Sequence, residues 1–264
     1  NRYLANYRNA IRYKVEENHS YSLFWKPIAD KLQGIEKVYF SPDGVYNQIN
    51  LNTLKRPAGD FMVNKYEITL VGNSKDLIRM KTQKPKVTKK SATLIGFPEY
   101  GAGDIAPLPG TKVEVESISK ILKGSGYQVA QFMQKNATEA NLKSLKASSI
   151  IHIATHGYFK STSEDNVGLA LSTITEDGLP DPGYITLTEL FSYRFANELV
   201  VISGCDTAMG LEQQGEGLNS LARGFLSRGS RHVISTLWPV SDKASARFMA
   251  LFYQNLQQTG DVAL

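Results

Sequence analysis

Short apolar segments alternate with amphipathic segments from residue 90 onward. The apolar segments predict strands at residues 92–97, 127–132, 150–155, 199–203 and 233–237. Between and after them, apolar residues recur at helical spacing and predict helices at residues 111–123, 138–145, 218–226 and 244–256. Strands that are apolar on both faces are typical of a parallel sheet between helices. We therefore expect an α/β fold of three layers, with a mainly parallel sheet flanked by helices.

The first part of the chain has a sparser pattern. Residues 23–32 have apolar positions at helical spacing and predict a helix that ends near Gly34, while residues 37–40 and 66–71 predict short strands. Residues 81–90 read KTQKPKVTKK, which lacks apolar periodicity and is typical of a solvated linker. This linker divides the chain into an N-terminal part, residues 1–85, and a C-terminal part, residues 86–264.

Composition narrows the classes of protein that fit this pattern. The 264 residues are 42% hydrophobic and 21% charged, and no apolar run approaches the roughly 20 residues of a membrane span. No signal-peptide pattern opens the chain, which starts at Asn1 without a methionine, as a fragment or processed product would. The net charge of +5 is mild, and the basic linker has no aromatic residues among its lysines. We therefore expect neither a membrane partner nor direct nucleic-acid binding.

The chain has one cysteine and four histidines. A single cysteine excludes an intramolecular disulfide, and so few histidines argue against a structural zinc site. We expect no metal, no cofactor and a reducing, cytoplasmic setting. From composition alone the cysteine has two interpretations: a small buried apolar side chain, which is the commoner case, or a reactive thiol.

Two reactive side chains follow predicted strands. The strand at 150–155 runs into His156 and Gly157, and the strand at 199–203 runs into Gly204 and Cys205. Ligands of open α/β sheets bind beyond the carboxyl ends of the strands, so the thiol and the imidazole can approach each other if these strands are neighbours. An imidazole can take the proton of a thiol and later give it to a leaving amine. The backbone N–H groups of Gly157 and Cys205 would form an oxyanion hole.

The remaining histidines and one glycine-rich motif have other interpretations. His152 lies in mid-strand and is expected to be buried, His232 starts a strand at the opposite edge, and His19 lies in a polar turn. Residues 101–106 match a loose GxGxxA dinucleotide fingerprint, but two prolines separate them from the next helix. A dinucleotide loop passes directly into a helix, so we interpret this segment as a flexible loop and keep nucleotide binding as an alternative.

Several segments between Leu108 and Tyr253 resemble a known family. They cover residues 108–116, 137–143, 151–157, 199–210, 215–225 and 235–242. In order and spacing they resemble the CHAT domain, a peptidase domain of the clan of caspases and separases. This domain is often found with tetratricopeptide (TPR) repeats. Residues 37–44 resemble the upstream portion of the same family. Gly204 stands where many members carry alanine. The family continues beyond the helix around Phe248 with a further helix and strand, so we expect the C-terminal end to be incomplete.

The resemblance implies a fold, an activity and roles for residues. It implies a caspase-haemoglobinase-like fold, with residues 1–85 as an N-terminal, pseudo-caspase-like part and residues 86–264 as the catalytic domain. It implies a cysteine endopeptidase (thiol protease) that forms a thioester acyl-enzyme, with Cys205 as nucleophile and His156 as general base and acid. Related arginine- and lysine-specific peptidases place an acidic side chain in the substrate pocket.

Candidates for that pocket lie after the nucleophile. Asp206 is adjacent to Cys205, Glu212 and Glu216 follow, and Trp238 lies after a strand at the same edge. Each has a structural alternative: Asp206 can bond the backbone of its own loop, and Trp238 can pack on the core. Residues 159–182 are rich in polar residues and predict an irregular activation loop that keeps the enzyme latent until a partner binds.

Beside the nucleotide-binding alternative, two functions with the CHAT fold remain. The first is an endopeptidase that cleaves a protein partner in prokaryotic antiviral defence or cell-death signalling, because the family is linked to CRISPR effectors and to gasdermins. A TPR module or a CRISPR effector would be its regulatory partner. The second is a non-catalytic interaction module with the CHAT fold.

Overall fold

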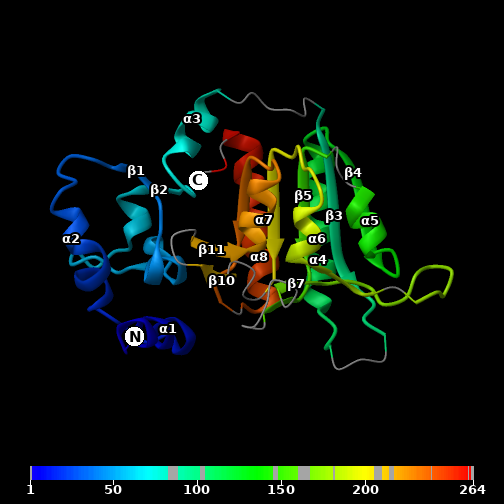
Figure 1. The fold of residues 1–264 in the computed structure, drawn as a ribbon, viewed down its shortest axis with the longest axis horizontal. Coiled ribbons are helices and arrows are strands. Elements are labelled where there is room, and N and C mark those ends of the chain that lie inside the picture. The colour runs from blue at the N-terminus through cyan, green and yellow to red at the C-terminus, as the bar shows by residue number, and fades with distance from the viewer. Residues whose placement is uncertain are drawn as a thin grey trace. The chain divides into compact units, whose positions relative to one another are not determined.

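The computed structural model describes residues 2–82, 89–101, 105–144, 148–159, 167–180, 182–204, 210–213, 217–238, 240–260 and 262. The chain forms two compact units (Figure 1). The first consists mainly of residues 1–82, and the second mainly of residues 83–213 and 218–262. Among the described helices, none has both the length and the apolar character needed to cross a membrane.

A parallel sheet is the centre of the second unit. Its five strands are ordered β12-β9-β5-β3-β4, and every neighbouring pair is parallel. The strands are β3 (Ser91–Pro98), β4 (Gln128–Gln134), β5 (Ile150–Ala154), β9 (Leu199–Ser203) and β12 (His232–Ser235). All of β5 and β9 is buried, as their apolar sequences predict. The expected parallel α/β fold is therefore confirmed.

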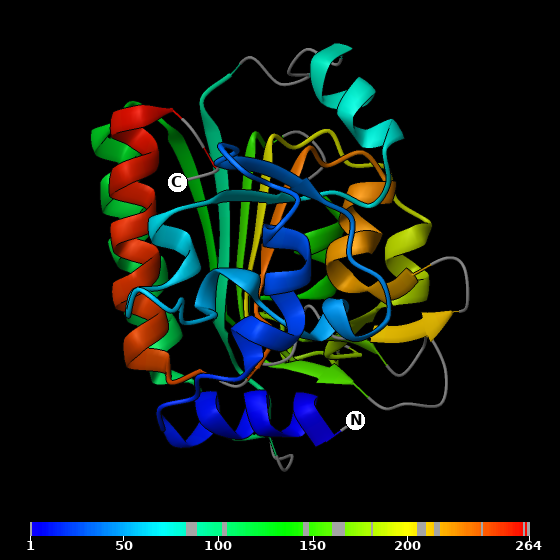
Figure 2. The ribbon, with the colours of Figure 1, turned by 90° about the vertical axis from the view of Figure 1, so that its left-hand side faces the viewer.

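Helices cover both faces of this sheet. One face carries α4 (Pro109–Gly124) and α8 (Asp242–Thr259), whose apolar side chains pack on alternate residues of the strands. The other face carries α5 (Glu139–Ser144), α6 (Leu187–Phe191) and α7 (Leu221–Ser227). Figure 2 shows the sheet nearly edge-on, with α8 on one side and α7 on the other. The three layers agree with the predicted architecture.

The strand order creates a point where the chain changes direction across the sheet. After β3 the chain adds β4 on one side, and then returns to add β5, β9 and β12 in succession on the other side. The connections that leave β3 and β5 therefore diverge at their shared carboxyl edge. Such a switch point is where open α/β sheets bind their ligands.

Smaller sheets follow β5 and β9. Strands β6 (Gly157–Phe159), β7 (Val167–Ala170) and β8 (Tyr184–Thr186) form an antiparallel sheet. Residues 159–182 were expected to be irregular. This expectation was wrong for residues 167–170, which form β7 and whose apolar side chains are buried in the core. Strands β10 (Gly210–Gln213) and β11 (Gly217–Ser220) pair with each other, so the helix expected at 218–226 begins only at Leu221, where Ser220 caps it.

The first unit is built around aromatic side chains. It contains α1 (Arg2–Tyr13), a π-helical turn (Tyr21–Trp25), α2 (Lys26–Ala29), α3 (Lys75–Thr82) and the parallel pair β1 (Lys37–Phe40) and β2 (Glu67–Leu70). Trp25 is fully buried, and its ring packs edge-on against Tyr66 at a centroid distance of 5.3 Å. The two predicted strands are present, and the predicted helix is divided into the π-helical turn and α2.

Candidate active site

His156 lies at the switch point of the sheet. It follows β5, which pairs with β9 so that Ala154 stands opposite Ser203. The Thr155 N–H extends the pairing and donates to the Ser203 carbonyl oxygen at 3.2 Å. The ends of β5 and β9 are thus direct neighbours. The sequence left this adjacency open, and the approach of His156 to Cys205 depends on it. Gly204 is the last described residue before Cys205 and Asp206, which lie outside the described residues.

One ring nitrogen of His156 is held by the backbone. Its Nε2 lies 2.8 Å from the carbonyl oxygen of Ala106, in the connection between β3 and α4. A carbonyl oxygen only accepts hydrogen bonds, so Nε2 carries the hydrogen in this contact. In the neutral imidazole Nδ1 is then the nitrogen with a free lone pair, so Nδ1 is the one that can act as a base.

The imidazole packs against the ring of Tyr100 in a tilted arrangement. The two rings have a centroid distance of 5.5 Å and an interplanar angle of 53°. Tyr100 is only 6% exposed, and its hydroxyl lies 2.8 Å from Thr155 Oγ1. Thr155 uses its single hydroxyl hydrogen to donate to the Ala170 carbonyl oxygen, so Tyr100 donates to Thr155. Burial raises the pKa of the Tyr100 hydroxyl, which keeps this donor protonated.

The segment that carries Tyr100 is anchored on both sides. The Glu99 carbonyl oxygen accepts from the Thr173 N–H and from the Ser172 hydroxyl, both at 3.1 Å. Gly101 has φ +67°, and a Cβ atom there would lie 2.6 Å from Thr173 Oγ1. Gly101 and Ala106 of the GxGxxA motif therefore have structural roles in this connection, and α4 begins only at Pro109.

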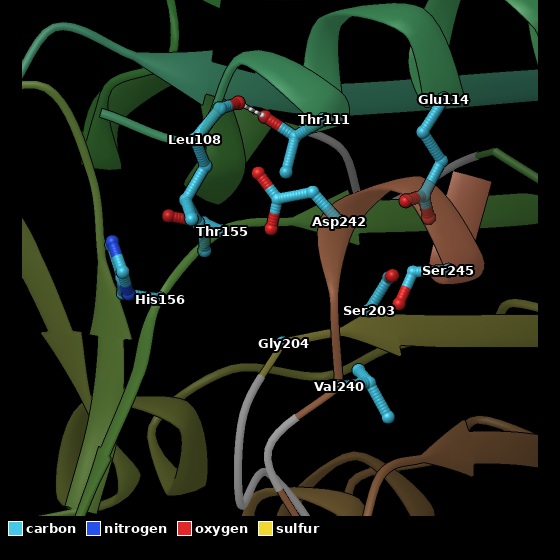
Figure 3. Close-up of a pocket in the computed structure, with 10 residues that line it drawn as sticks. All are labelled: Leu108, Thr111, Glu114, Thr155, His156, Ser203, Gly204, Val240, Asp242 and Ser245. Carbon is cyan, nitrogen blue, oxygen red and sulfur yellow. Dashed lines mark hydrogen bonds between the residues drawn. The ribbon is translucent and has the colours of Figure 1, made fainter. Parts of the chain in front are cut away.

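A small pocket, lined by both apolar and polar side chains, opens beside His156 (Figure 3). It reaches from the ends of β5 and β9 to the first turns of α4 and α8. The volume open to the centre of a water molecule is about 20 Å³, enough for roughly one water molecule. Its lining residues are Leu108, Thr111, Glu114, Thr155, His156, Ser203, Gly204, Val240, Asp242 and Ser245.

A buried polar chain borders this pocket. Glu114 on α4, His152 on β5 and Tyr253 on α8 are all fully buried. His152 Nε2 lies 3.0 Å from Glu114 Oε1, and the Tyr253 hydroxyl lies 3.3 Å from His152 Nδ1. The second oxygen of Glu114, Oε2, is buried without a hydrogen-bond partner. His152 is buried, as its mid-strand position predicts, but it also links both helices of this layer to the sheet.

The structure describes the other candidates from the sequence only in part. Gly157 is the first residue of β6, and Trp238 is half-buried after β12 but does not line the pocket. Glu212 lies in β10, where only the backbone is described, and Glu216 lies outside the described residues together with Cys205 and Asp206. Across the part of the chain that the structure describes, no cluster of three or more His, Cys, Asp or Glu side chains could hold a metal ion.

Sequence reasoning missed two acidic residues and two contacts of the imidazole. Glu114 had a detectable signal, because it lies one turn before Ile118 on the apolar face of its helix, and a carboxylate there is unusual. Asp242 had no such signal, because acidic residues are common in the first turn of a helix. Ala106 acts through its backbone, so its side chain carries no signal. Tyr100 looks like an ordinary core aromatic residue.

The fold and the comparisons agree on a class of protein. A five-stranded parallel sheet between helices is consistent with a caspase-like fold. A family model described as the CHAT domain matches residues 19–264, and the chain belongs to this family. Tetratricopeptide repeat protein 28 of Mus musculus is 38% identical over 72 residues. That match covers 27% of this chain and only 3% of the mouse protein.

Proposed function

We propose that this CHAT domain is a cysteine endopeptidase in which Cys205 is the nucleophile and His156 is the general base and acid. The pairing of β5 with β9 is the observation that carries the proposal. Ile150 stands opposite Leu199 and Ala154 opposite Ser203, and the same offset of 49 positions separates His156 from Cys205. Neighbouring strands lie about 4.8 Å apart, so an extension of this register would bring the two reactive side chains together.

The imidazole is prepared for this chemistry. With Nε2 bound to the Ala106 carbonyl, Nδ1 takes the proton of the thiol and leaves a thiolate. The thiolate sulfur attacks the carbonyl carbon of the substrate, and the carbonyl oxygen becomes an oxyanion. When the carbon–nitrogen bond breaks, the protonated imidazole gives its proton to the leaving amine and a thioester remains. Water, deprotonated by the imidazole, then hydrolyses the thioester and restores the thiol.

Gly157 is a suitable donor to the oxyanion. It stands opposite Leu169 in the antiparallel ladder of β6 and β7, and the Ala170 N–H donates to the His156 carbonyl oxygen at 2.8 Å. This pattern makes Gly157 and Leu169 a pair that does not exchange hydrogen bonds, so the Gly157 N–H points away from β7. An N–H that is not used in the ladder can bind an oxyanion.

The regulation and the biological role of the peptidase are also part of the proposal. The name of the mouse relative supports a TPR module as a regulatory partner, and the substrate would be a protein. Latency until a partner binds and a role in prokaryotic antiviral defence, in a cytoplasmic setting, follow from the family resemblance.

The single cysteine makes a direct test possible. The rate of its alkylation by iodoacetamide, read by intact mass, reports the thiolate fraction at each pH. We expect His156→Ala to shift the alkylation profile toward that of an ordinary thiol, with a pKa near 8.5, and the exposed His19→Ala to leave it unchanged. Proteome-wide cleavage mapping with wild-type and Cys205→Ala protein completes the test. A profile that is insensitive to His156, or a biological function that survives Cys205→Ala, would favour the non-catalytic interaction module.

A further inference from the structure

The pocket beside His156 contains an unsatisfied negative group. Glu114 is fully buried, and Oε2 is the oxygen that no group within the described residues satisfies. In Figure 3 the Glu114 carboxylate points toward the side chains of Ser203 and Ser245. A buried carboxylate oxygen without a donor is costly, so the pocket favours an occupant that donates hydrogen bonds and carries positive charge.

A second carboxylate adds to the negative charge of the pocket. Asp242 is the first residue of α8, and its Oδ2 accepts from the Gly110 N–H at 3.3 Å. Both this amide and the helix N-terminus place a partial positive charge beside the carboxylate. Ser203, Ser245 and Thr111 place hydroxyl groups around the same space. An anion would be repelled here, and an apolar group would leave Oε2 unsatisfied.

We infer that this pocket receives the terminal ammonium group of a lysine side chain from the substrate, at the residue before the bond that is cleaved. The inference rests on the proposed function. The pocket is lined by His156 and by Gly204, which precedes Cys205, so an occupant that enters it lies beside the reacting atoms. Leu108 and Val240 also line it and supply apolar contact for the methylene groups of the lysine.

Size favours lysine over arginine. An ammonium group is compact and has three donors, which suits a space of about 20 Å³ that holds roughly one water molecule. A guanidinium group is planar, wider, and has five donors in a fixed fork. Lysine would therefore replace one water molecule, whereas arginine would require the first turns of α4 and α8 to separate.

Peptidyl acyloxymethyl ketones with lysine, norleucine or arginine next to the reactive group test this inference. Norleucine has an apolar side chain of similar length that lacks the ammonium group, and the single cysteine allows labelling of the full chain to be read by intact mass. We expect the lysine probe to label Cys205 roughly 10- to 100-fold faster than the norleucine probe, as a charge-assisted hydrogen bond to a buried carboxylate would produce. The arginine probe should label more slowly than the lysine probe.

Variants identify the carboxylates responsible. Asp242→Asn and Glu114→Gln should each reduce the advantage of lysine over norleucine at least several-fold. Glu116→Gln, on the exposed side of α4, is the matched control and should preserve that advantage. If Glu114→Gln fails to fold because His152 loses its charged partner, Asp242→Asn still decides the question.

Each outcome has one meaning. Equal labelling by the lysine and norleucine probes overturns the inference and leaves the proposed peptidase standing. Labelling by none of the probes, in a chain whose alkylation profile depends on His156, overturns the inference; if that profile is also insensitive to His156, the proposed peptidase is overturned with it.

Discussion

The ring of Tyr100 packs against the imidazole of His156, and its hydroxyl bonds the side chain of the residue just before that histidine. Ala106, a few positions further along the same connection, holds Nε2 of the imidazole. Two contacts from one segment therefore fix the face and the tautomer of His156. Because the connection leaves β3 and the histidine leaves β5, the switch point of the sheet is what brings them together.

Tyr100 is expected to act as a positioning residue. Tyr100→Leu removes the ring, and we expect it to slow alkylation of Cys205 near neutral pH roughly 10- to 100-fold, because the imidazole is no longer held in place. Tyr100→Phe keeps the ring and loses only the bond to Thr155, so its effect should be smaller. The measurement is the pH profile of iodoacetamide alkylation, with the melting temperature recorded in parallel.

The parallel measurement separates positioning from simple stability. A role confined to core packing predicts that Tyr100→Leu lowers the melting temperature while the pH profile stays like that of the wild type. A shifted profile in a variant that remains folded at the assay temperature supports positioning. The smaller effect of Tyr100→Phe is a further requirement of the argument.

Gly110 allows the first turns of α4 and α8 to meet. A Cβ atom at this position would overlap the Cβ of Asp242, whereas a Cβ at Gly124, at the other end of α4, would meet nothing within 4 Å. We expect Gly110→Ala to reduce the free energy of unfolding by about 1–3 kcal/mol through overpacking. Gly124→Ala should be neutral or stabilising by up to about 1 kcal/mol, because alanine favours the helix. Urea unfolding of the two variants checks both values, and equal effects would contradict the close approach.

The parallel sheet was predictable because its central strands β5 and β9 are buried on both faces. Residues 150–155 and 199–203 are mostly apolar without alternation, and few structures other than buried strands suit such short runs. The sequence also places His156 and Cys205 at the carboxyl ends of strands, although adjacency of β5 and β9 required the structure. The order of strands depends on long-range packing, which local patterns do not encode.

The contacts around the site could not be predicted in the same way. Ala106 acts through a carbonyl oxygen, and any residue type would supply one. The acidic candidates were sought in the segment just after Cys205, whereas the carboxylates that line the pocket belong to α4 and α8. Strand β7 is only four residues long and lies within a polar segment, so its burial had little local signal.

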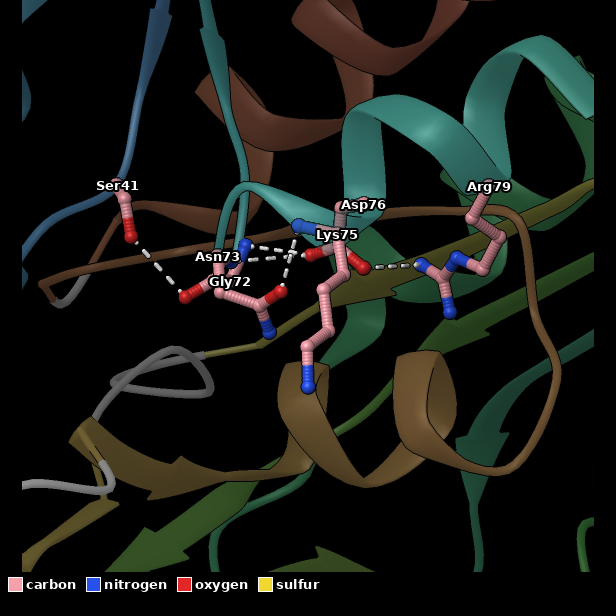
Figure 4. A network of polar contacts seen from close by, with 6 residues as sticks. All are labelled: Ser41, Gly72, Asn73, Lys75, Asp76 and Arg79. Atoms are coloured by element: carbon pink, nitrogen blue, oxygen red, sulfur yellow. Dashed lines mark hydrogen bonds and ion pairs between the residues drawn. The ribbon is translucent and has the colours of Figure 1, made fainter.

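Asp76 organises the first turn of α3 in the first unit. Its Oδ2 accepts from the Gly72 N–H at 2.8 Å and from the Asn73 N–H at 3.3 Å, and its Oδ1 lies 3.5 Å from Arg79 (Figure 4). We expect Asp76→Ala to destabilise this turn by about 1 kcal/mol and to speed hydrogen exchange in peptides covering residues 72–82 of the full chain. Asp30→Ala, at an exposed aspartate of the same unit, is the control and should leave that exchange unchanged. Exchange that is unaffected by Asp76→Ala would mean that the helix start does not depend on this carboxylate.

Tyr253 should make the protein sensitive to alkaline pH. Burial raises the pKa of its hydroxyl well above the ordinary value, and the nearby charge of Glu114 raises it further. The folded state therefore keeps the proton after the unfolded state begins to lose it near pH 10, so this stabilisation is complete below about pH 10 and is lost as the pH rises further. We expect Tyr253→Phe to cost about 0.5–1.5 kcal/mol near neutral pH, because the bond to His152 is lost. Above about pH 10 the stability of the variant should fall less steeply than that of the wild type, by up to about 1.4 kcal/mol per pH unit. Urea unfolding at neutral and alkaline pH measures both effects. The other tyrosines are common to both proteins, so any difference between the two pH profiles comes from Tyr253. Parallel profiles would show that Tyr253 does not titrate as its burial requires.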